Sequence, residues 1–172
     1  MLSTYRKLSR SKKILVIAAG VFLVAQLAQP DRSDIASDPS HDLIASTHPS
    51  PEVEGMLRTA CYDCHSSHTT YPWYSYVTPV NFWLQHHVDE GREEANLSEW
   101  TTLPERKRAH FVDEAEELIG EGEMPLPSYT WIHGDADLNT DQRKLLGDFF
   151  QGLPEAAIEW RRERRKQERE AD

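Results

Sequence analysis

Both cysteines of this 172-residue chain lie in the segment 61–65, which reads Cys-Tyr-Asp-Cys-His. Residues three apart on a helical turn share one face. Two thiols at this spacing can therefore each bond to one of the two vinyl groups of the porphyrin ring of a haem. The imidazole that follows then points at the iron. This spacing is the attachment pattern of c-type haem. The sequence therefore predicts one covalent haem c, held by Cys61 and Cys64, with His65 as an iron ligand.

Three other uses of two cysteines compete with haem attachment. A structural disulfide is strained at this spacing and leaves His65 without a role. A thioredoxin-like redox pair needs a βαβ setting, whereas the surrounding pattern is helical. A zinc site needs further thiolates or paired histidines, and the chain has no second cysteine pair. Haem attachment is favoured over all three.

The first 28 residues have the composition of an export segment. Basic residues without any acid occupy the start, and a nearly unbroken apolar run follows from Ile14 to Ala28. As a helix this run spans roughly 22 Å, less than the roughly 30 Å hydrocarbon core of a bilayer, which favours a cleaved signal peptide. The small residues that a signal peptidase needs are poorly matched, however, which favours an uncleaved anchor. Residues 1–28 are therefore predicted to be a signal peptide or an uncleaved membrane anchor helix, with the rest of the chain in the periplasm.

The chain is acidic. Lys and Arg number 19 against 29 Asp and Glu, which gives a formal net charge of −10 at pH 7. Several of the basic residues lie in the export segment, so the exported part is more acidic still. Such a field repels nucleic acid and steers basic protein surfaces towards the chain. The expected partners are basic redox proteins and, through an uncleaved N-terminus, the membrane.

The rest of the chain is predicted to be all-α, with one small helical domain around the haem. Residues 29–50, rich in Asp, Ser and Pro, are predicted to form a linker. The haem-binding domain is predicted over 51–153, and a charged, solvated helical tail over 154–172. Apolar periodicity indicates the helices of the domain. They run from Pro51 into Cys61, over 79–95, over 104–119 with Pro104 as first residue, and from Asn139 or Thr140 onward.

The second axial ligand of the iron decides between electron transfer and small-molecule chemistry. Of the three methionines, Met1 lies in the export segment and Met56 in the first helix of the domain. Met124 stands in the sequence Gly-Glu-Met-Pro-Leu-Pro, a non-helical loop that suits a thioether placed against a haem face. Met124 is therefore the predicted ligand. The alternatives, all histidines, are His87, His86 and His133.

Several short motifs carry a resemblance to known proteins. They are Cys61–Ser66, Tyr71-Pro72-Trp73-Tyr74, Pro79, His87-Val88, Gly91-Arg92, Asn96, Ser98, Trp100, Met124-Pro125, Tyr129 and His133. On these motifs, residues 57–150 resemble the bacterial haem-binding domain family of short, N-terminally anchored c-type proteins. More broadly, the order of helices, haem motif and Met-Pro loop is similar to class I cytochromes c. The resemblance implies covalent haem binding and a cytochrome c-like helical fold.

Further residues are predicted to contact the haem. The aromatic loop 71–76, which contains Trp73, is expected to shield the ring together with Trp83 and Trp131. Arg92 would pair with a haem propionate, because a guanidinium offers two donors to a carboxylate. A surface ion pair is the other use of Arg92.

Electron transfer is the leading functional hypothesis, with His65 and Met124 staying bound while the iron changes oxidation state. The first alternative is a haem peroxidase or a gas or redox sensor with an open or displaceable distal site. The second is a non-haem protein with a Cys61–Cys64 disulfide. Catalytic triads and glycine-rich phosphate loops are absent from the sequence, so no catalytic residue is assigned. An electron carrier is favoured over an enzyme.

Overall fold

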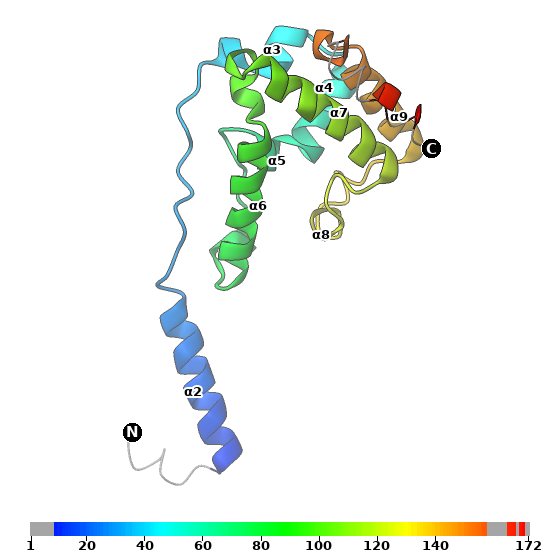
Figure 1. Cartoon of the computed structure of the whole chain (residues 1–172). Helices are drawn as coiled ribbons and strands as arrows, with labels where there is room; N and C mark the ends of the chain where they lie inside the picture. The colour runs from blue at the N-terminus through cyan, green and yellow to red at the C-terminus, as the bar shows by residue number, and fades with distance from the viewer. Residues whose placement is uncertain (1–8, 158–164, 168, 171–172) are drawn as a thin grey trace. The chain divides into compact units, whose positions relative to one another are not determined.

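A computed structural model describes residues 9–157, 165–167 and 169–170 of the chain (Figure 1). Within these residues every regular element is an α-helix or a 3₁₀ turn, and none is a strand. The predicted all-α class is confirmed. The chain divides into two compact units, 1–33 with 71–87 and 34–70 with 88–172.

The first unit starts with α2 (Arg10–Ala25), a 16-residue helix capped by Ser9, whose hydroxyl accepts from the Lys12 amide. None of the residues of α2 is buried. Its large apolar side chains, from Ile14 to Val24, are exposed. No helix in the described part of the chain is long and apolar enough to cross a membrane, so the predicted anchor helix gains no support from the fold.

The segment that follows α2 is fastened to the loop around η2 (Trp73–Tyr76). The Gln26 side-chain amide and the Thr78 backbone exchange two hydrogen bonds, of 3.3 and 2.9 Å. The Thr78 hydroxyl also donates to the Ala28 carbonyl, and Arg32 donates to the Ser75 carbonyl, each at 3.1 Å. Polar contacts, rather than apolar burial, therefore hold this unit together.

The second unit contains the hydrophobic core. Helices α4 (Pro51–Ala60), α7 (Glu105–Glu121) and α9 (Thr140–Gln151) each bury an apolar face, and α7 and α9 pack along each other (Figure 1). Burying one large apolar side chain contributes roughly 1.5–3 kcal/mol, so this core fixes the helices around it. Its most deeply buried large side chains are Leu43, Leu57, Leu97, Trp100, Val112, Leu146 and Phe150.

Part of the predicted linker 29–50 is folded. Asp42 caps α3 (Leu43–Thr47) by accepting hydrogen bonds from two amides of its first turn. Leu43 and Ile44 are buried in the core of the second unit. Because α3 is little more than one turn long, it offers no apolar periodicity for a sequence to reveal. The remaining short elements are η1 (Pro39–His41), η3 (Leu97–Thr102) and η4 (Pro154–Ala157).

The four predicted helices are confirmed, with small shifts at their ends. The second is α6 (Val80–Glu94), which begins in the first unit and ends in the second. The sequence predicts Pro104 as the first helical residue of α7, but its ψ of 138° makes it the N-cap. Gly122 ends α7 with a φ of 80°, the left-handed conformation that glycine adopts without strain. Asn139 and Gln142 cap α9 reciprocally.

The charged tail is described only in part, because 158–164, 168 and 171–172 lie outside the described residues. Arg165 is helical and bridges two acids of α7, Asp113 at 2.9 Å and Glu116 at 2.8 Å. At this residue the tail contacts the domain, which differs from the solvated helix that the sequence predicts.

Candidate functional site

The Cys-x-x-Cys-His segment forms a single helical turn. Cys61 is both the C-cap of α4 and the N-cap of α5 (Tyr62–His65). The amides of Cys64 and His65 both donate to the Cys61 carbonyl, at 3.2 and 2.9 Å. Both thiols are free. The turn therefore has the helical geometry that places residues three apart on one face.

His65 is held through one ring nitrogen while the other remains available. Nδ1 lies 3.3 Å from the Ala95 carbonyl oxygen. Since a carbonyl only accepts, Nδ1 carries the proton. Burial lowers the pKa of His65 below its ordinary value, although the Ala95 and Gly91 carbonyls oppose that shift. The imidazole is thus neutral at pH 7 with the lone pair on Nε2, which is the form that binds a metal.

The plane of the His65 ring is set by aromatic packing. Phe111 of α7 meets it edge to face, with the ring centres 5.5 Å apart and the planes at 61°. Phe111 in turn contacts Trp100 and Phe150, each at 6.0 Å. The sequence does not reveal this contact of Phe111, because it depends on how two distant helices pack.

Helix α6 passes close to the haem-motif turn because Gly91 has no side chain. A Cβ at Gly91 would lie 2.9 Å from the Cys64 carbonyl oxygen and 3.2 Å from the Cys64 Cβ. The next residue, Arg92, donates from Nε to the Ser66 carbonyl at 2.7 Å and from Nη2 to the Thr69 hydroxyl at 3.1 Å. These bonds tie α6 to the segment after the turn. The pairing of Arg92 with a haem propionate stays a prediction.

Polar side chains extend this attachment. The Asn96 amide donates to the Ser67 hydroxyl at 2.9 Å, and the Ser67 backbone amide donates to the Ser98 hydroxyl at 3.2 Å. The Asn96 side chain also accepts from the Ser98 amide at 3.1 Å. Ser67 and Ser98 are buried, where a polar group is stable only if it is hydrogen-bonded. Asn96 and Ser98 thus hold the segment after the haem-motif turn against the residues that follow α6.

A cavity that opens to solvent lies beside His65. The haem-motif turn contributes Cys61 and His65 to its wall, and the loop after α7 contributes Met124 and Pro125. Only Glu94 and Glu114 add charge. The rest of the wall is apolar, formed by Ala60, Phe111, Ala115, Leu118, Ile119, Leu138, Leu146 and Phe150. A thiol, an imidazole and a thioether around one apolar cavity fit a haem, whose ring is apolar and whose iron takes nitrogen and sulfur ligands.

Met124 reaches the cavity from the loop between α7 and α8 (Pro127–Thr130). It is half-buried against the core, and its amide donates to the Leu118 carbonyl at 3.1 Å. The structure thus brings Met124 and His65 onto the wall of one cavity, as two ligands of one iron require. Coordination by Met124 stays a prediction.

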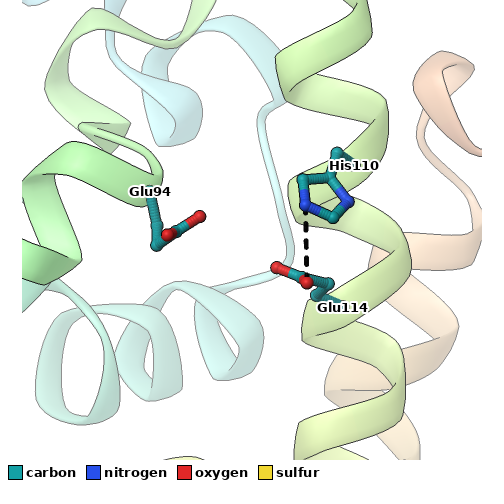
Figure 2. Close-up of side chains that lie close together, drawn as sticks. All are labelled: Glu94, His110 and Glu114. Carbon is teal, nitrogen blue, oxygen red and sulfur yellow. Dashed lines mark ion pairs between the residues drawn. The ribbon is translucent and has the colours of Figure 1, made fainter.

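Two glutamates of the cavity wall, Glu94 and Glu114, lie close to His110 (Figure 2). Glu94 ends α6, and His110 and Glu114 lie one turn apart on α7. Each offers one ligand atom within 4.8 Å of the others, and the His110 Nε2 is 3.4 Å from the Glu114 carboxylate. Glu94 and His110 are exposed and Glu114 is half-buried. The two carboxylates therefore favour cations over anions at this part of the cavity.

Other residues that the sequence singled out lie elsewhere. Trp73 belongs to the first unit and is 79% exposed, and its contact with haem stays a prediction. His87, in the same unit, packs edge to face against Trp83 with ring centres 4.6 Å apart. Trp131 is 89% exposed and is absent from the described wall of the cavity. The expectation that Trp131 shields the haem ring stays a prediction.

Both thiols are poor nucleophiles in the folded chain. Burial raises the pKa of Cys61 to about 12, and the neighbouring Cys64 adds to the effect. Burial also raises the pKa of Cys64 to about 11, where Asp63 adds to the rise and Arg92 opposes it. Since the thiolate is the reactive form, the cysteines are almost wholly protonated and unreactive at pH 7.

Residues 20–152, most of the chain, match the model of a protein family described as a haem-binding domain. This range contains the haem-motif turn, the whole described wall of the cavity and the Met124 loop. No curated protein and no solved structure matches the chain. The broader likeness to class I cytochromes c therefore stays a prediction.

Proposed function

The chain belongs to the haem-binding domain family, and we propose that it carries one haem c and transfers electrons. Cys61 and Cys64 would form the thioether bonds, and His65 and Met124 would be the axial ligands. The haem would supply a one-electron couple between ferric and ferrous iron. The residues around the cavity would hold the haem and its two iron ligands.

The observation that carries the proposal is the shared cavity of His65 and Met124. The Ala95 carbonyl and the Phe111 ring fix the imidazole on one side, and the Leu118 carbonyl holds the Met124 backbone on another. The mostly apolar wall disfavours water next to the iron, which would favour retention of both ligands over exchange with solvent. Histidine with methionine also gives a comparatively high reduction potential, which suits an electron carrier.

The alternative of a peroxidase or sensor has less support from the cavity. Such a protein needs an open position on the iron and, for peroxide chemistry, a nearby acid–base group. Within the second unit, His65 is the only histidine on the described wall. Glu94 and Glu114 lie on the wall but are exposed or half-buried. Electron transfer therefore remains the better proposal.

We further propose that the protein works on the periplasmic side of a bacterial inner membrane. The basic start and the apolar run that follows support export, with the segment 1–28 either cleaved or kept as an attachment to the membrane. The acidic net charge supports basic redox proteins as partners, because opposite charge speeds encounter. Salt that screens the field should slow such an exchange.

Covalent attachment is tested by producing the chain together with the c-type haem-attachment machinery. Wild-type protein should keep its haem through acid–acetone extraction and give a c-type pyridine haemochrome spectrum. A variant with both Cys61→Ser and Cys64→Ser should release all its haem to the solvent. Haem that is extracted from the wild type as readily as from this variant would refute a covalent bond.

The axial role of Met124 is tested with a matched pair of volume-conserving substitutions. Met124→Leu removes the thioether from the cavity, whereas Met56→Leu changes a buried core methionine and should cost less than about 1.5 kcal/mol. Only Met124→Leu should alter the visible spectrum, lower the reduction potential and let the reduced protein bind carbon monoxide. Fast, tight carbon monoxide binding by the wild type would instead favour the sensor or peroxidase alternative.

A further inference from the structure

The loop that carries Met124 is joined to the haem-motif turn by one side-chain hydrogen bond. The Tyr129 hydroxyl of α8 donates to Oδ2 of Asp63 at 2.7 Å, and it also lies 3.3 Å from the Thr59 carbonyl. Asp63 stands between the two cysteines of the motif. This bond therefore connects the two parts of the chain that reach the cavity from different directions.

Asp63 is itself fixed. Its Oδ1 accepts from the Thr70 amide at 3.2 Å, and its backbone carbonyl accepts from the Thr69 hydroxyl at 2.7 Å. Since Arg92 also donates to that hydroxyl, Asp63 belongs to the network that binds α6 to the turn. The carboxylate is thus an anchored acceptor, and Tyr129 gains a fixed partner.

Tyr129 is also restrained by its ring. The ring stacks on His133 with the centres 4.3 Å apart and the planes at 13°. Burial and the adjacent carboxylate raise the pKa of Tyr129, so its hydroxyl keeps the proton that it donates. A hydrogen bond to a charged group is stronger than one between neutral groups.

The other end of the same loop is held by the backbone. Beyond Gly122, the amides of Glu123 and Met124 both donate to the Leu118 carbonyl, at 2.8 and 3.1 Å. Met124 therefore lies between a helix end on one side and the Tyr129–Asp63 bond on the other. Only four residues separate Met124 from Tyr129, which is too short a segment to move freely when both ends are held.

We infer that Tyr129 is a positioning residue that holds the Met124 loop against the haem-motif turn and thereby keeps the distal side of the haem closed. The inference rests on the proposed role of Met124 as axial ligand. An intact Tyr129–Asp63 bond would hold the loop in place and favour electron transfer. Loss of this bond would release the loop and open the iron to small ligands.

The test is carbon monoxide binding by reduced, haem-loaded Tyr129→Phe, which keeps the ring and removes only the hydroxyl. Loss of a hydrogen bond to a carboxylate should raise the carbon monoxide affinity at least about tenfold. Thr102→Val is the control, because it removes an exposed hydroxyl that donates to the Glu99 carboxylate at 3.3 Å and Thr102 is not part of the described cavity wall, and it should leave the affinity unchanged. Affinity equal to wild type in a folded, fully loaded Tyr129→Phe protein would overturn the inference.

Combining Tyr129→Phe with Met124→Leu distinguishes a positioning role of Tyr129 from a general loss of structure. If Tyr129 acts through Met124, Tyr129→Phe should change the affinity by less than about twofold once Met124→Leu is already present. An effect of equal size in both backgrounds would show that Tyr129 acts independently of Met124, and the inference would fail. If Met124→Leu alone leaves carbon monoxide binding unchanged, the proposed ligand itself is wrong, which is a distinct outcome.

Discussion

The two sides of the cavity are held in different ways. The His65 side is a helical turn whose neighbours in sequence, Cys61 and Cys64, complete the motif, and α6 packs on it through Gly91 and Arg92. The Met124 side is a loop, fixed by backbone bonds to Leu118 and by one hydrogen bond between distant side chains. The first side is rigid by local geometry, whereas the second depends on a few long-range contacts.

Under the proposed function, this difference would let the protein retain its haem through the His65 side and adjust ligand exchange through the Met124 side. A ligand on a helical turn is placed by the backbone hydrogen bonds of that turn, so changes that disturb the turn also displace the ligand. The distance between a loop ligand and the iron changes when either end of that loop shifts slightly. We therefore expect substitutions near His65 to impair folding or attachment, and substitutions near Met124 to alter ligand exchange first.

The largest expected effect concerns the two half-buried thiols on the His65 side. With the pKa of Cys61 raised from 9.0 to about 12, the folded haem-free chain at pH 8 should react with iodoacetamide about a thousandfold more slowly at Cys61 than the chain in urea. Cys64, whose pKa is about 11, should be slowed about a hundredfold. Mass spectrometry of quenched samples measures both rates, and equal rates in the two states would contradict the raised pKa values of the thiols.

The same shifts fix the sign of a pH dependence. Above about pH 9 the unfolded chain releases the thiol protons that the folded chain retains, so the free energy of unfolding should fall as the pH rises further. Below that pH the contribution is constant. A haem-free variant with both cysteines replaced by serine is the control and should show a smaller decline, to which Tyr62 and Tyr129, whose pKa values are also raised by burial, still contribute.

A smaller effect is expected where α6 touches the turn. Gly91→Ala would place a Cβ 2.9 Å from the Cys64 carbonyl oxygen, and overpacking of this kind should lower the free energy of unfolding by about 2 kcal/mol. Gly120→Ala on α7 is the control, because no atom lies within 4 Å of its added Cβ and alanine favours a helix by up to about 1 kcal/mol. Urea unfolding measures both. A neutral Gly91→Ala would mean that the packing is looser than described.

The smallest effect on stability is expected on the Met124 side. Gly122→Ala forces a left-handed backbone at a φ of 80°, at a cost of about 1 kcal/mol. The added Cβ would also meet the guanidinium of Arg143, but a flexible side chain moves aside. Urea unfolding should show less loss than Gly91→Ala, while carbon monoxide binding by the reduced protein should increase. A greater loss of stability than that of Gly91→Ala would reverse the comparison between the two sides.

Much of the fold follows from local patterns in the sequence. Apolar periodicity and capping residues predict α4, α6, α7 and α9, because a helix face repeats every three or four residues. The brief α3, with Leu43 and Ile44 in the core, was missed since one turn contains no repeat. The aromatic contact of Phe111 with His65 was missed for another reason, because it joins two elements whose packing no local pattern encodes.

By itself, the sequence placed two thiols and an imidazole on one turn, because residues three and four apart on a helix share a face. The tertiary structure decided the opposite side. It placed Met124 on the same cavity wall as His65 and joined Tyr129 to Asp63 across 66 residues of chain. Spacing on a helix fixes neighbours directly, whereas contacts between remote segments form only when the core has brought their helices together.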